Sequence, residues 1–498
     1  MYRQVILGFS DYYQGGGMNE QIAEVFNPAT GKVIRQFTYA NHDEVEATIQ
    51  IAKTAYESWS QFTPLKRARV LFKFKQLLEE NINQIAELIS EEHGKVVDDA
   101  KGEVNRAIEL VEYMCGIPHL LKGSFSENVG TGVDSYTIRQ PLGVCVGITP
   151  FNFPVMVPCW MFVSAIACGN AFVLKPSEKD PSSTLLVAKL FQDAGLPEGV
   201  LTFVHGVKEQ VTQLITHPDV QAVSCVGSTP VAESIYKTAI EHGKRSHTFG
   251  GAKNHCIVMP DADLDDAASA IMGAAYGAAG ERCMALSVVI AVTDAVADSL
   301  VEKLRQKIPL LKIAAGNEPD VDMGPLVTEA HLKNVLSYVE LGIDEGAELV
   351  ADGRKPPENV DGFFMRPCLF DHVTPAMKIY QAEIFGPVLC IVRQADFAQA
   401  LTLINQHEYG NGTAIFTSSG EIAQQFATKV NVGMVGINVP IPVPVAYHAF
   451  GGWKRSIFGD THMHGDESIR FYTKTKSVTT RWPKRDVEDT LSFHMPSH

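Results

Sequence analysis

The stretch from Val144 to Lys179 reads VCVGITPFNFPVMVPCWMFVSAIACGNAFVLKPSEK, and it decides the fold class. Its first residues, 144–149, are mostly apolar and β-branched, as in a buried strand. An apolar helix is expected over 158–168, and a second short apolar strand over 171–174. A strand, a helix and a strand in this order predict two parallel neighbours in one sheet.

The same alternation continues along the chain. Further strands are expected over 201–204 and 222–226, and helices over 182–194, 207–216 and 230–243. This pattern predicts a doubly wound parallel sheet, whose ligands bind at the carboxyl ends of its strands. Upstream, amphipathic helices that pack as one layer are expected over 43–58, 64–81, 83–94 and 97–115.

A second α/β domain is expected after His255, and it contains a candidate nucleophile. A helix over 263–276 leads to Gly277-Ala278-Ala279-Gly280-Glu281-Arg282-Cys283-Met284. The two glycines are expected to end the helix in a tight turn that carries Cys283. Backbone N–H groups and the neighbouring Arg282 would favour a thiolate there. For this segment alone, a buried structural cysteine is the alternative.

Two segments predict a small β structure outside both domains. Residues 126–141 alternate polar β-formers and suggest a hairpin that leaves the main body, and 470–482 reads as a strand that pairs with it. The fold class is therefore α/β, with two doubly wound parallel α/β domains and a small β-flap. The expected bounds are 1–122 with 143–254 for the first domain, 255–445 for the second, and 123–142 with 465–498 for the flap and tail.

Composition limits the class of protein. At 498 residues the chain is too long for one core, and its formal charge of −15 argues against nucleic acid and anionic membranes as partners. The sequence has no run of eighteen apolar residues, so no membrane span is predicted. The nine cysteines form no C-x-x-C pair, which points to a reducing compartment. Because residues 1–13 also lack a signal-peptide pattern, we expect a cytoplasmic protein. No metal site is predicted.

Three expected strand ends carry candidate ligand-binding residues. The dinucleotide fingerprint G-x-G-x-x-G is absent, but Ser228 opens a helix whose N-terminus can face a phosphate; most such turns only cap helices. Lys175 and Glu178 have a spacing that suits two ribose hydroxyls, with a solvated loop as the alternative. Asn152 lies between aromatic residues and prolines, as a rigid oxyanion donor must; a plain turn residue is the alternative.

Taken together, these stretches resemble the aldehyde dehydrogenase superfamily nearly from end to end. The resemblance implies a three-part fold with an NAD-binding domain, a catalytic domain and an oligomerisation β-flap. It also implies self-association, which we expect to give a homotetramer, a dimer of dimers. The motifs that carry it are Asn27-Pro28-Ala29-Thr30-Gly31, Phe151-Asn152-Phe153-Pro154, Leu174-Lys175-Pro176-Ser177-Glu178, Val226-Gly227-Ser228-Thr229, Gly280 to Cys283, and Glu383 to Val388.

The resemblance also implies roles for single residues. Cys283 would be the nucleophile, and Asn152 with the Cys283 N–H would form the oxyanion hole. Glu178 close to the ribose argues for NAD over NADP by charge repulsion. The complete set implied for NAD binding is Thr149, Phe151, Lys175, Glu178, Lys179, Ser228, Gly250 and Glu383.

One departure from the superfamily pattern narrows the reaction. Typical members carry Glu-Leu-Gly-Gly-Lys before the domain junction, and that Glu activates the deacylating water. Here the segment reads Thr248-Phe249-Gly250-Gly251-Ala252-Lys253-Asn254, and Thr248 cannot act as a base. Water has a pKa of about 15.7 and a thiol about 8.5, a difference of roughly 10 kcal/mol, so a thiol acceptor needs no carboxylate. The expected acceptor is coenzyme A.

The segments 250–255, Gly280 to Met284, 158–162 and 450–456 resemble the methylmalonate-semialdehyde dehydrogenases. That resemblance implies NAD-dependent, CoA-acylating oxidation and decarboxylation of malonate or methylmalonate semialdehyde to acetyl-CoA or propionyl-CoA. It also implies that Arg106 and Arg282 bind the substrate carboxylate, for which guanidinium groups are suited. For Arg106, a helix-surface ion pair with a carboxylate such as Glu103 or Glu109 is the alternative.

Three other functions compete with this one. A hydrolytic aldehyde dehydrogenase with a base from elsewhere would release a free carboxylic acid without coenzyme A. A non-catalytic binding or structural protein on the same fold would be marked by loss of Cys283 or Asn152, and both are present. A glutamyl-phosphate-reductase-like enzyme would need a phosphate site and no arginine pair.

Overall fold

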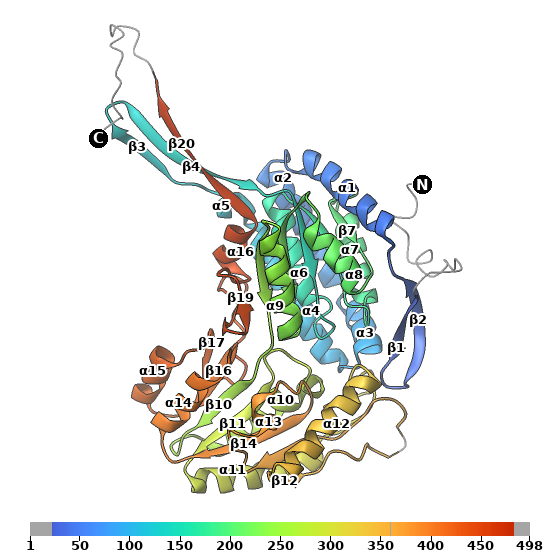
Figure 1. The fold of residues 1–498 in the computed structure, drawn as a ribbon, viewed down its shortest axis with the longest axis vertical. Coiled ribbons are helices and arrows are strands. Elements are labelled where there is room, and N and C mark those ends of the chain that lie inside the picture. Colours follow the sequence, from blue (N-terminus) through green and yellow to red (C-terminus); the bar gives the residue numbers. More distant parts are fainter. Residues whose placement is uncertain (1–21, 359, 483–498) are drawn as a thin grey trace.

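The computed structural model describes residues 22–358 and 360–482, and it contains two α/β units and a projecting β-flap (Figure 1). One unit is built on a six-stranded sheet, the other on a seven-stranded sheet, and the flap on three strands. The predicted fold class is therefore confirmed. Of the predicted domain bounds, the parts over 1–21 and 483–498 lie outside the described residues.

The first sheet has the strand order β19-β9-β8-β5-β6-β7, and all its pairs are parallel except β19 with β9. Because β5 lies between β6 and β8, the winding direction reverses beside it, and ligands bind at such a switch point in open α/β sheets. The strands are β5 (Val144–Ile148), β6 (Ala171–Lys175), β7 (Leu201–Phe203), β8 (Val220–Val226), β9 (Arg245–Phe249) and β19 (Ile457–Phe458).

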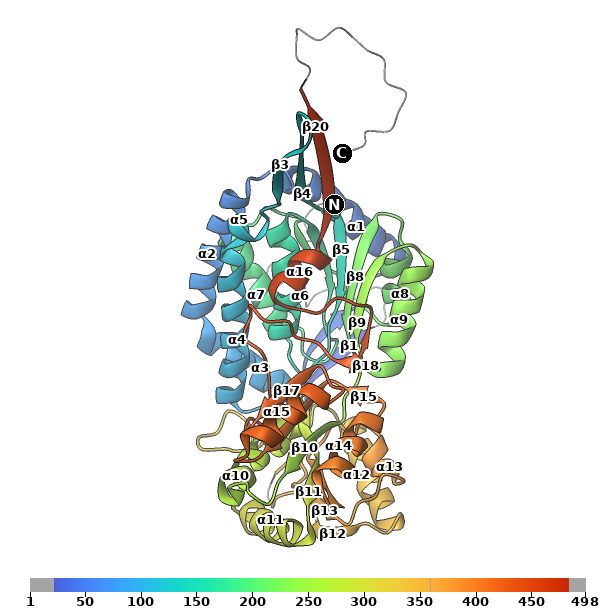
Figure 2. The same cartoon turned by 90° about the vertical axis from the view of Figure 1, so that its left-hand side faces the viewer.

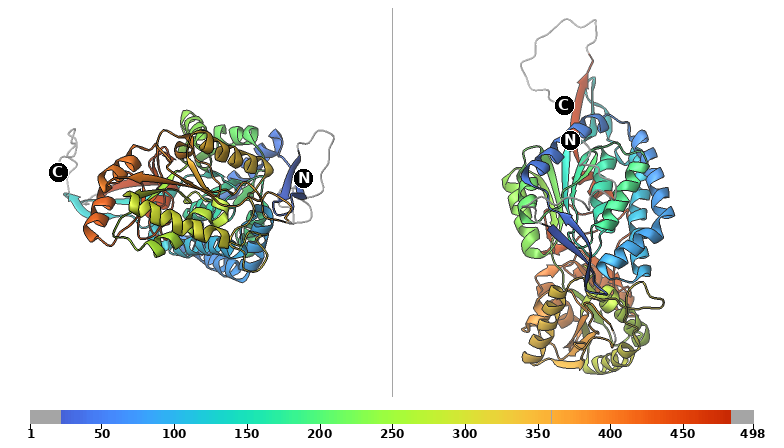
Figure 3. Two further views of the ribbon diagram at one scale, coloured as in Figure 1. Left: turned by 90° about the horizontal axis from the view of Figure 1, so that it is seen from below. Right: turned by 90° about the vertical axis from the view of Figure 1, so that its right-hand side faces the viewer.

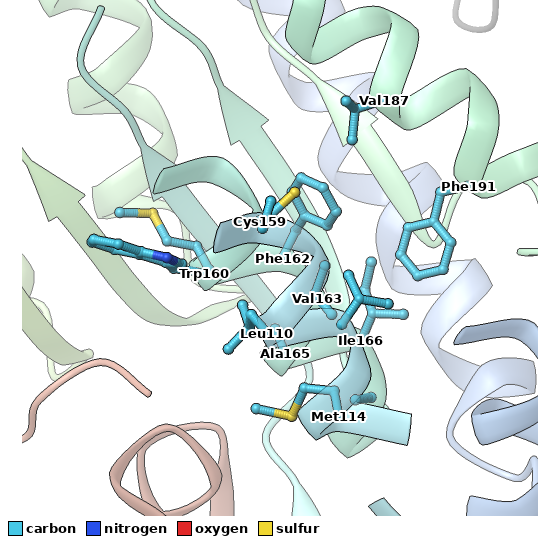
Figure 4. Close-up of a cluster of buried hydrophobic side chains, with 14 of the residues drawn as sticks. Leu110, Met114, Cys159, Trp160, Phe162, Val163, Ala165, Ile166, Val187 and Phe191 are labelled. Atoms are coloured by element: carbon cyan, nitrogen blue, oxygen red, sulfur yellow. The ribbon is translucent and has the colours of Figure 1, made fainter. Parts of the chain in front are cut away.

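Helix α6 (Met156–Cys168) is buried along its whole length, as its apolar sequence dictates. Its rings and aliphatic side chains lie among those of α4 and α7 (Figure 4). Helix α16 (Gly465–Phe471) covers another side of it (Figure 2). The other helices of this unit are α1 (His42–Trp59), α2 (Pro64–Glu80), α3 (Ile82–His93), α4 (Val97–Cys115), α5 (Ile117–Leu120), α7 (Ser182–Asp193), α8 (Lys208–Thr216) and α9 (Thr229–Glu241).

The second sheet has the order β12-β13-β14-β11-β10-β16-β17 and is parallel except for β12. Its strands are β10 (Asn254–Val258), β11 (Leu286–Val292), β12 (Glu348–Ala351), β13 (Cys368–Asp371), β14 (Val388–Gln394), β16 (Gly412–Phe416) and β17 (Met434–Ile437). Its helices are α10 (Leu264–Tyr276), α11 (Asp294–Lys307), α12 (Glu329–Asp344), α13 (Lys378–Gln381), α14 (Phe397–Gln406) and α15 (Gly420–Lys429), with short 3₁₀ turns η1 (Gly277–Gly280) and η2 (Ile308–Leu310). No helix among the described residues is long and apolar enough to cross a membrane.

A connection of only four residues, 250–253, joins the carboxyl end of β9 to the amino end of β10. The ligand-binding edge of the first sheet therefore meets the amino edge of the second. After β17 the chain returns to the first unit: β18 (Trp453–Lys454) pairs with β15 (Tyr409–Gly410), and β19 then pairs with β9. The predicted bounds left this returning segment unassigned, and they remain a prediction.

Two antiparallel β structures lie at the outside of the molecule. In the flap, β20 (Thr473–Arg481) pairs along its whole length with β4 (Val133–Pro141), which also pairs with β3 (Phe125–Gly130). The predicted pairing of hairpin and tail is thus confirmed, although the strand begins at Thr473 because α16 occupies the residues before it. The hairpin of β1 (Ile22–Asn27) and β2 (Lys32–Thr38) lies on another side (Figure 3).

A buried amide, that of Asn170, ties the root of the flap to the first sheet. Its Oδ1 accepts hydrogen bonds from the N–H groups of Leu142 at 2.6 Å and Gly143 at 3.0 Å. Its Nδ2 donates to the carbonyls of Ala165 at 3.0 Å and Tyr472 at 2.9 Å. One side chain therefore joins β5, the end of α6 and the segment before β20.

We predict that Asn170→Asp lowers the free energy of unfolding by about 3 kcal/mol, because an acceptor then faces the carbonyls of Ala165 and Tyr472 where a donor stood. Urea unfolding followed by tryptophan fluorescence measures this change. Asn405→Asp is the matched control, since the partly exposed Asn405 also donates to a carbonyl and accepts from an N–H. Water can replace its bonds, so we expect a loss below about 1 kcal/mol. Equal losses would contradict this role of Asn170.

Candidate functional site

The turn that carries Cys283 has an unusual backbone. The predicted helix before it is confirmed as α10, with Asp263 as the N-cap that accepts from two N–H groups. The chain leaves the helix through Ala278 and Ala279, which adopt left-handed φ angles of 49° and 51°, and then Gly280 at 74°. Gly277, predicted to break the helix, is its C-cap residue, with φ −55° and ψ 140°. Left-handed alanines cost about 1–2 kcal/mol each, so packing must hold this turn.

Two glycines bring three backbone segments together around this turn. A Cβ at Gly280 would lie 2.3 Å from the carbonyl oxygen of Gly386, so no larger residue fits against the 383–387 turn. A Cβ at Gly251 would lie 2.4 Å from Glu383 Oε2. Glu383 Oε1 in turn accepts from the N–H of Ala252 at 2.9 Å. The β9–β10 connection, the Cys283 turn and the Glu383 turn therefore meet.

Two side-chain amides fix the main chain of Cys283. Its carbonyl accepts from Asn254 Nδ2 at 2.9 Å and from Asn411 Nδ2 at 3.0 Å. Asn254 also donates to the carbonyl of Ala285 at 2.9 Å and accepts from the N–H of Gly412 at 3.0 Å. The cysteine is therefore anchored to the amino ends of β10 and β16.

Cys283 lines a narrow pocket between the β9–β10 connection and the Glu383 turn. Burial, followed by the charge of Glu383, raises its pKa to about 12, whereas backbone N–H groups and Lys95 act in the opposite direction. The side chain is nevertheless partly exposed, and water at the pocket mouth offsets part of this desolvation. The expectation that Arg282 favours the thiolate stays a prediction; the structure shows its guanidinium group paired with Asp99. The pocket is lined by Ala252, Lys253, Asn254, Gly280, Arg282, Cys283, Ala285, Leu286, Ser287, Glu383, Ile384, Phe385, Gly386 and Val388.

Both candidate arginines for a substrate carboxylate already contact protein carboxylates. Arg282 Nη2 lies 2.6 Å from Oδ1 of Asp99 on α4, and a Cβ at Gly277 would touch its guanidinium group. Arg106, two turns further along α4, lies 2.9 Å from Glu109. The surface ion pair considered for Arg106 is therefore present. Arg282 lines the Cys283 pocket, and the described pocket lining does not include Arg106.

Asn152 follows β5 in a buried loop. Its main-chain carbonyl accepts from Lys95 Nζ at 2.5 Å, while no described residue hydrogen-bonds to its side-chain amide. The backbone is thus fixed and the amide donors remain available to a ligand. This is the arrangement that an oxyanion donor requires.

The candidate NAD-binding residues lie at the carboxyl edge of the first sheet. Thr149 follows β5 and bonds to the main chain of Lys175, whose ammonium group pairs with Glu178 at 2.8 Å. Ser228 is the exposed N-cap residue of α9, and its side chain makes no capping bond. Gly250 follows β9, where its N–H donates to the carbonyl of Ser456 at 3.0 Å.

Phe151 and Lys179 face inward from this edge. Lys179 Nζ lies 4.1 Å from the centroid of the Phe151 ring, a cation–π contact. The same ring lies 5.9 Å from Phe385, edge to face, next to Glu383. These two residues therefore connect the carboxyl edge of the first sheet to the Glu383 turn.

Thr248 occupies a position where it cannot activate water. It is fully buried in β9, and its hydroxyl donates to the carbonyl of Ala232 at 2.8 Å. Phe249, the next residue, is buried in the core of the first unit. No described group of three or more His, Cys, Asp or Glu side chains has the geometry to hold a metal ion.

Behind the Cys283 turn lies a buried acid next to two histidines. Burial raises the pKa of Glu281 to about 8, although its Oε1 accepts from the N–H of Val327 at 3.2 Å. His93 and His331 lie 3.9 Å and 3.6 Å from this carboxyl. Burial lowers the pKa of both histidines, so they are neutral at pH 7.

Sequence reasoning missed the residues that hold the site. Asn254 stood in the quoted motif, and an amide at the start of a buried strand was a usable signal. Lys95 and Asn411 carry no sequence signal of a role in the site. Lys95 follows a polar helix end, which is typical of a solvent-exposed position, and the pattern around Asn411 is typical of a turn.

Comparison with known proteins assigns the chain and its fold to one family. The model of the aldehyde dehydrogenase family matches residues 15–478. A malonate-semialdehyde dehydrogenase of Pseudomonas aeruginosa is 56% identical over 481 residues, which cover 96% of this chain and 97% of that protein.

Two solved structures are similar over nearly their whole length. The methylmalonate-semialdehyde dehydrogenase of Oceanimonas doudoroffii superposes with a TM-score of 0.92 at 56% identity, covering 94% of this chain and 96% of that one. A candidate methylmalonate-semialdehyde dehydrogenase of Sinorhizobium meliloti, complexed with NAD, gives 0.93 at 51% identity, covering 96% and 97%.

We predict that Glu281→Gln gains stability over the wild type as the pH rises from 5 to 8. In the unfolded chain this carboxyl ionises above about pH 4.5, but in the folded protein it stays protonated up to about pH 8, so wild-type stability falls between these values. Glutamine has no proton to lose and still accepts from Val327. Urea unfolding at several pH values should show a difference of a few kcal/mol at pH 8 and little at pH 5. Parallel curves for the two proteins would rule this out.

Proposed function

Since this chain belongs to the aldehyde dehydrogenase family, we propose that it oxidises malonate or methylmalonate semialdehyde with NAD⁺ and passes the acyl group to coenzyme A. Loss of CO₂ makes the products acetyl-CoA or propionyl-CoA. Thr248 is the main support for transfer of the acyl group to coenzyme A. Its buried hydroxyl donates to a main-chain carbonyl at the position where a hydrolytic enzyme needs a base.

The described residues fit NAD at the carboxyl edge of the first sheet. The paired Lys175 and Glu178 offer a donor and an acceptor to a ribose, and the exposed N-terminus of α9 at Ser228 suits a pyrophosphate. Glu383 sits on Gly251 beside Cys283, where it would hold the second ribose. Bound NAD⁺ supplies the acceptor for the aldehyde hydride.

Cys283 and Asn152 carry the oxidation step. The thiolate attacks the aldehyde carbon, and the amide of Asn152 with the Cys283 N–H stabilises the oxyanion that forms. When this adduct collapses, the carbonyl re-forms, hydride leaves, and an acyl thioester remains on Cys283. The anchored main chain of Cys283 keeps its N–H directed at the oxyanion.

The same oxyanion hole serves the loss of CO₂. A carboxylate β to the thioester carbonyl leaves its bonding electrons to an enolate oxygen, which Asn152 stabilises. The enolate carbon then takes a proton from water. We propose that this happens on the acyl-enzyme, before coenzyme A attacks the thioester carbon and Cys283 leaves as the thiolate.

Arg282 is the residue of this chain best placed to bind the substrate carboxylate. It lines the pocket of Cys283, where its Nη2 donates to Asp99 at 2.6 Å and its Nη1 to the carbonyl of Gly273 at 3.4 Å. A guanidinium group has five N–H donors, so a second carboxylate can be held beside the first. Arg106 stays a proposed second contact.

Assembly and location are proposals as well. The flap exposes Phe125 and ends near the exposed Trp482, which supports its use in a homotetramer built as a dimer of dimers. Nine unpaired cysteines support a reducing compartment, for which we propose the cytoplasm.

We predict that NADH formation from malonate semialdehyde requires coenzyme A for steady turnover. Without it, one burst per subunit should be followed by a rate lower by about 10²–10⁴, the contribution of the missing general base. Absorbance of NADH in rapid mixing measures both phases. Cys283→Ala should remove the burst and the turnover alike.

The runner-up is hydrolysis, and one observation favours it. Burial raises the pKa of Glu383 to about 7, and this carboxyl is close enough to affect Cys283. If Glu383 activated water, fast turnover without coenzyme A would yield free acid, and Glu383→Gln would abolish it. That pair of results would refute the proposed acyl transfer.

We predict that Arg282→Leu raises the KM for malonate semialdehyde by about 10–100-fold, since a charge-assisted hydrogen bond contributes about 1.5–3 kcal/mol. The KM for propionaldehyde, which has no carboxylate, should change less than about threefold. Initial rates with both aldehydes measure this. Arg305→Leu, in an exposed pair with Glu302, is the control. Equal changes for both aldehydes would remove the proposed role of Arg282.

A further inference from the structure

A buried lysine lies directly behind the loop that carries Asn152. Lys95 follows the left-handed Gly94 at the end of α3, and its side chain is fully enclosed. Its Nζ donates to the carbonyl of Asn152 at 2.5 Å and to Glu103 Oε2 at 2.9 Å. It also lies 4.4 Å from the centroid of the Phe153 ring. The ammonium group is therefore held from three sides.

Glu103 continues this contact to the start of α6. Its second oxygen, Oε1, accepts from the N–H groups of Val155 at 2.8 Å and Met156 at 3.0 Å. These are N–H groups that a helix start leaves without a partner. Lys95 and Glu103 thus hold the Asn152 loop at its carbonyl and at its far end.

The backbone that carries Lys95 is fixed to the second unit. The N–H of Val97 donates to the carbonyl of Gly316 at 3.0 Å. A Cβ at Gly316 would lie 2.3 Å from the carbonyl oxygen of Lys95, and a Cβ at Gly324 would clash with that of Gly94. Lys95 therefore links the second unit, which contains Cys283, to the Asn152 loop of the first.

The charge of Lys95 reaches the nucleophile. It lowers the pKa of the Cys283 thiol, whereas Glu383 raises it. The other titratable groups that face Lys95 are Glu103, which it contacts, and the more distant Asp99, Asp180, Glu281 and His93. A buried ion pair is a weak source of stability, so a role in the reaction explains Lys95 better than a role in folding.

We propose that Lys95 is a positioning residue for acyl transfer: its ammonium group holds the carbonyl of Asn152 so that the amide of that residue meets the oxyanion. This role rests on the proposed function. The effect of Lys95 on the reactivity of Cys283 concerns the protein alone and can be measured without substrate.

The test is the pH dependence of Cys283 alkylation by iodoacetamide, followed by mass spectrometry on protein free of NAD and coenzyme A. The other eight cysteines are buried, which favours reaction at Cys283. In Lys95→Met the midpoint of the rate profile should rise by about one pH unit, so that alkylation below the midpoint slows about tenfold. In the full reaction kcat should fall about 100-fold, as for loss of an oxyanion donor, while KM stays within threefold.

A second variant keeps the proposal testable if Lys95→Met does not fold. Lys95→Met with Glu103→Gln leaves no unpaired buried charge and retains an oxygen for Val155 and Met156; its midpoint and kcat should change in the same directions. Lys244→Met is the matched control, because Lys244 is a buried lysine that donates to a carbonyl far from the site. It should leave the profile unchanged.

The outcomes separate the two proposals. A folded Lys95 variant with the wild-type midpoint, and kcat within threefold, overturns the role of Lys95. A raised midpoint in a protein that turns over without coenzyme A leaves the role of Lys95 standing and refutes the proposed acyl acceptor.

Discussion

The side-chain amide of Asn254 is the constraint on which the site depends. One residue binds the carbonyls of Cys283 and Ala285 and the N–H of Gly412, so it fixes the cysteine turn against the amino ends of three strands. The four-residue connection before it places Cys283 opposite the carboxyl edge of the first sheet. In the proposed reaction the acyl group on Cys283 lies at this edge, and β9, which ends there, carries Thr248 instead of a carboxylate.

Several ionisable side chains are buried at the site. Burial raises the pKa of Glu281 to about 8 and of Glu383 to about 7, and Lys95 is enclosed within the fold. Buried ionisable groups of this kind cost stability and cluster at functional sites. Here the left-handed alanines before Cys283 add to that cost. A role in positioning the reacting groups explains the buried ionisable groups and the left-handed alanines better than a role in folding does.

The order of strands and helices was readable from the sequence because each element has its own apolar period. Cys283, Asn152 and Thr248 could be proposed as site residues because each stands in a motif. The pairing of Arg282 with Asp99, and of Lys95 with Asn152, was not. These contacts join residues far apart in the chain, and no local pattern of residues records them. The left-handed conformation of Ala278 was likewise hidden, because alanine favours the helix that it ends here.

The central claim is that an acyl group waits on Cys283 until a thiol removes it. Mass spectrometry of the intact protein, quenched in acid after mixing with malonate semialdehyde and NAD⁺, tests this directly. The account predicts an acyl adduct on Cys283 that persists for minutes and disappears at once when coenzyme A is added. Free acid formed without any accumulated adduct, at a rate that coenzyme A does not change, would contradict it.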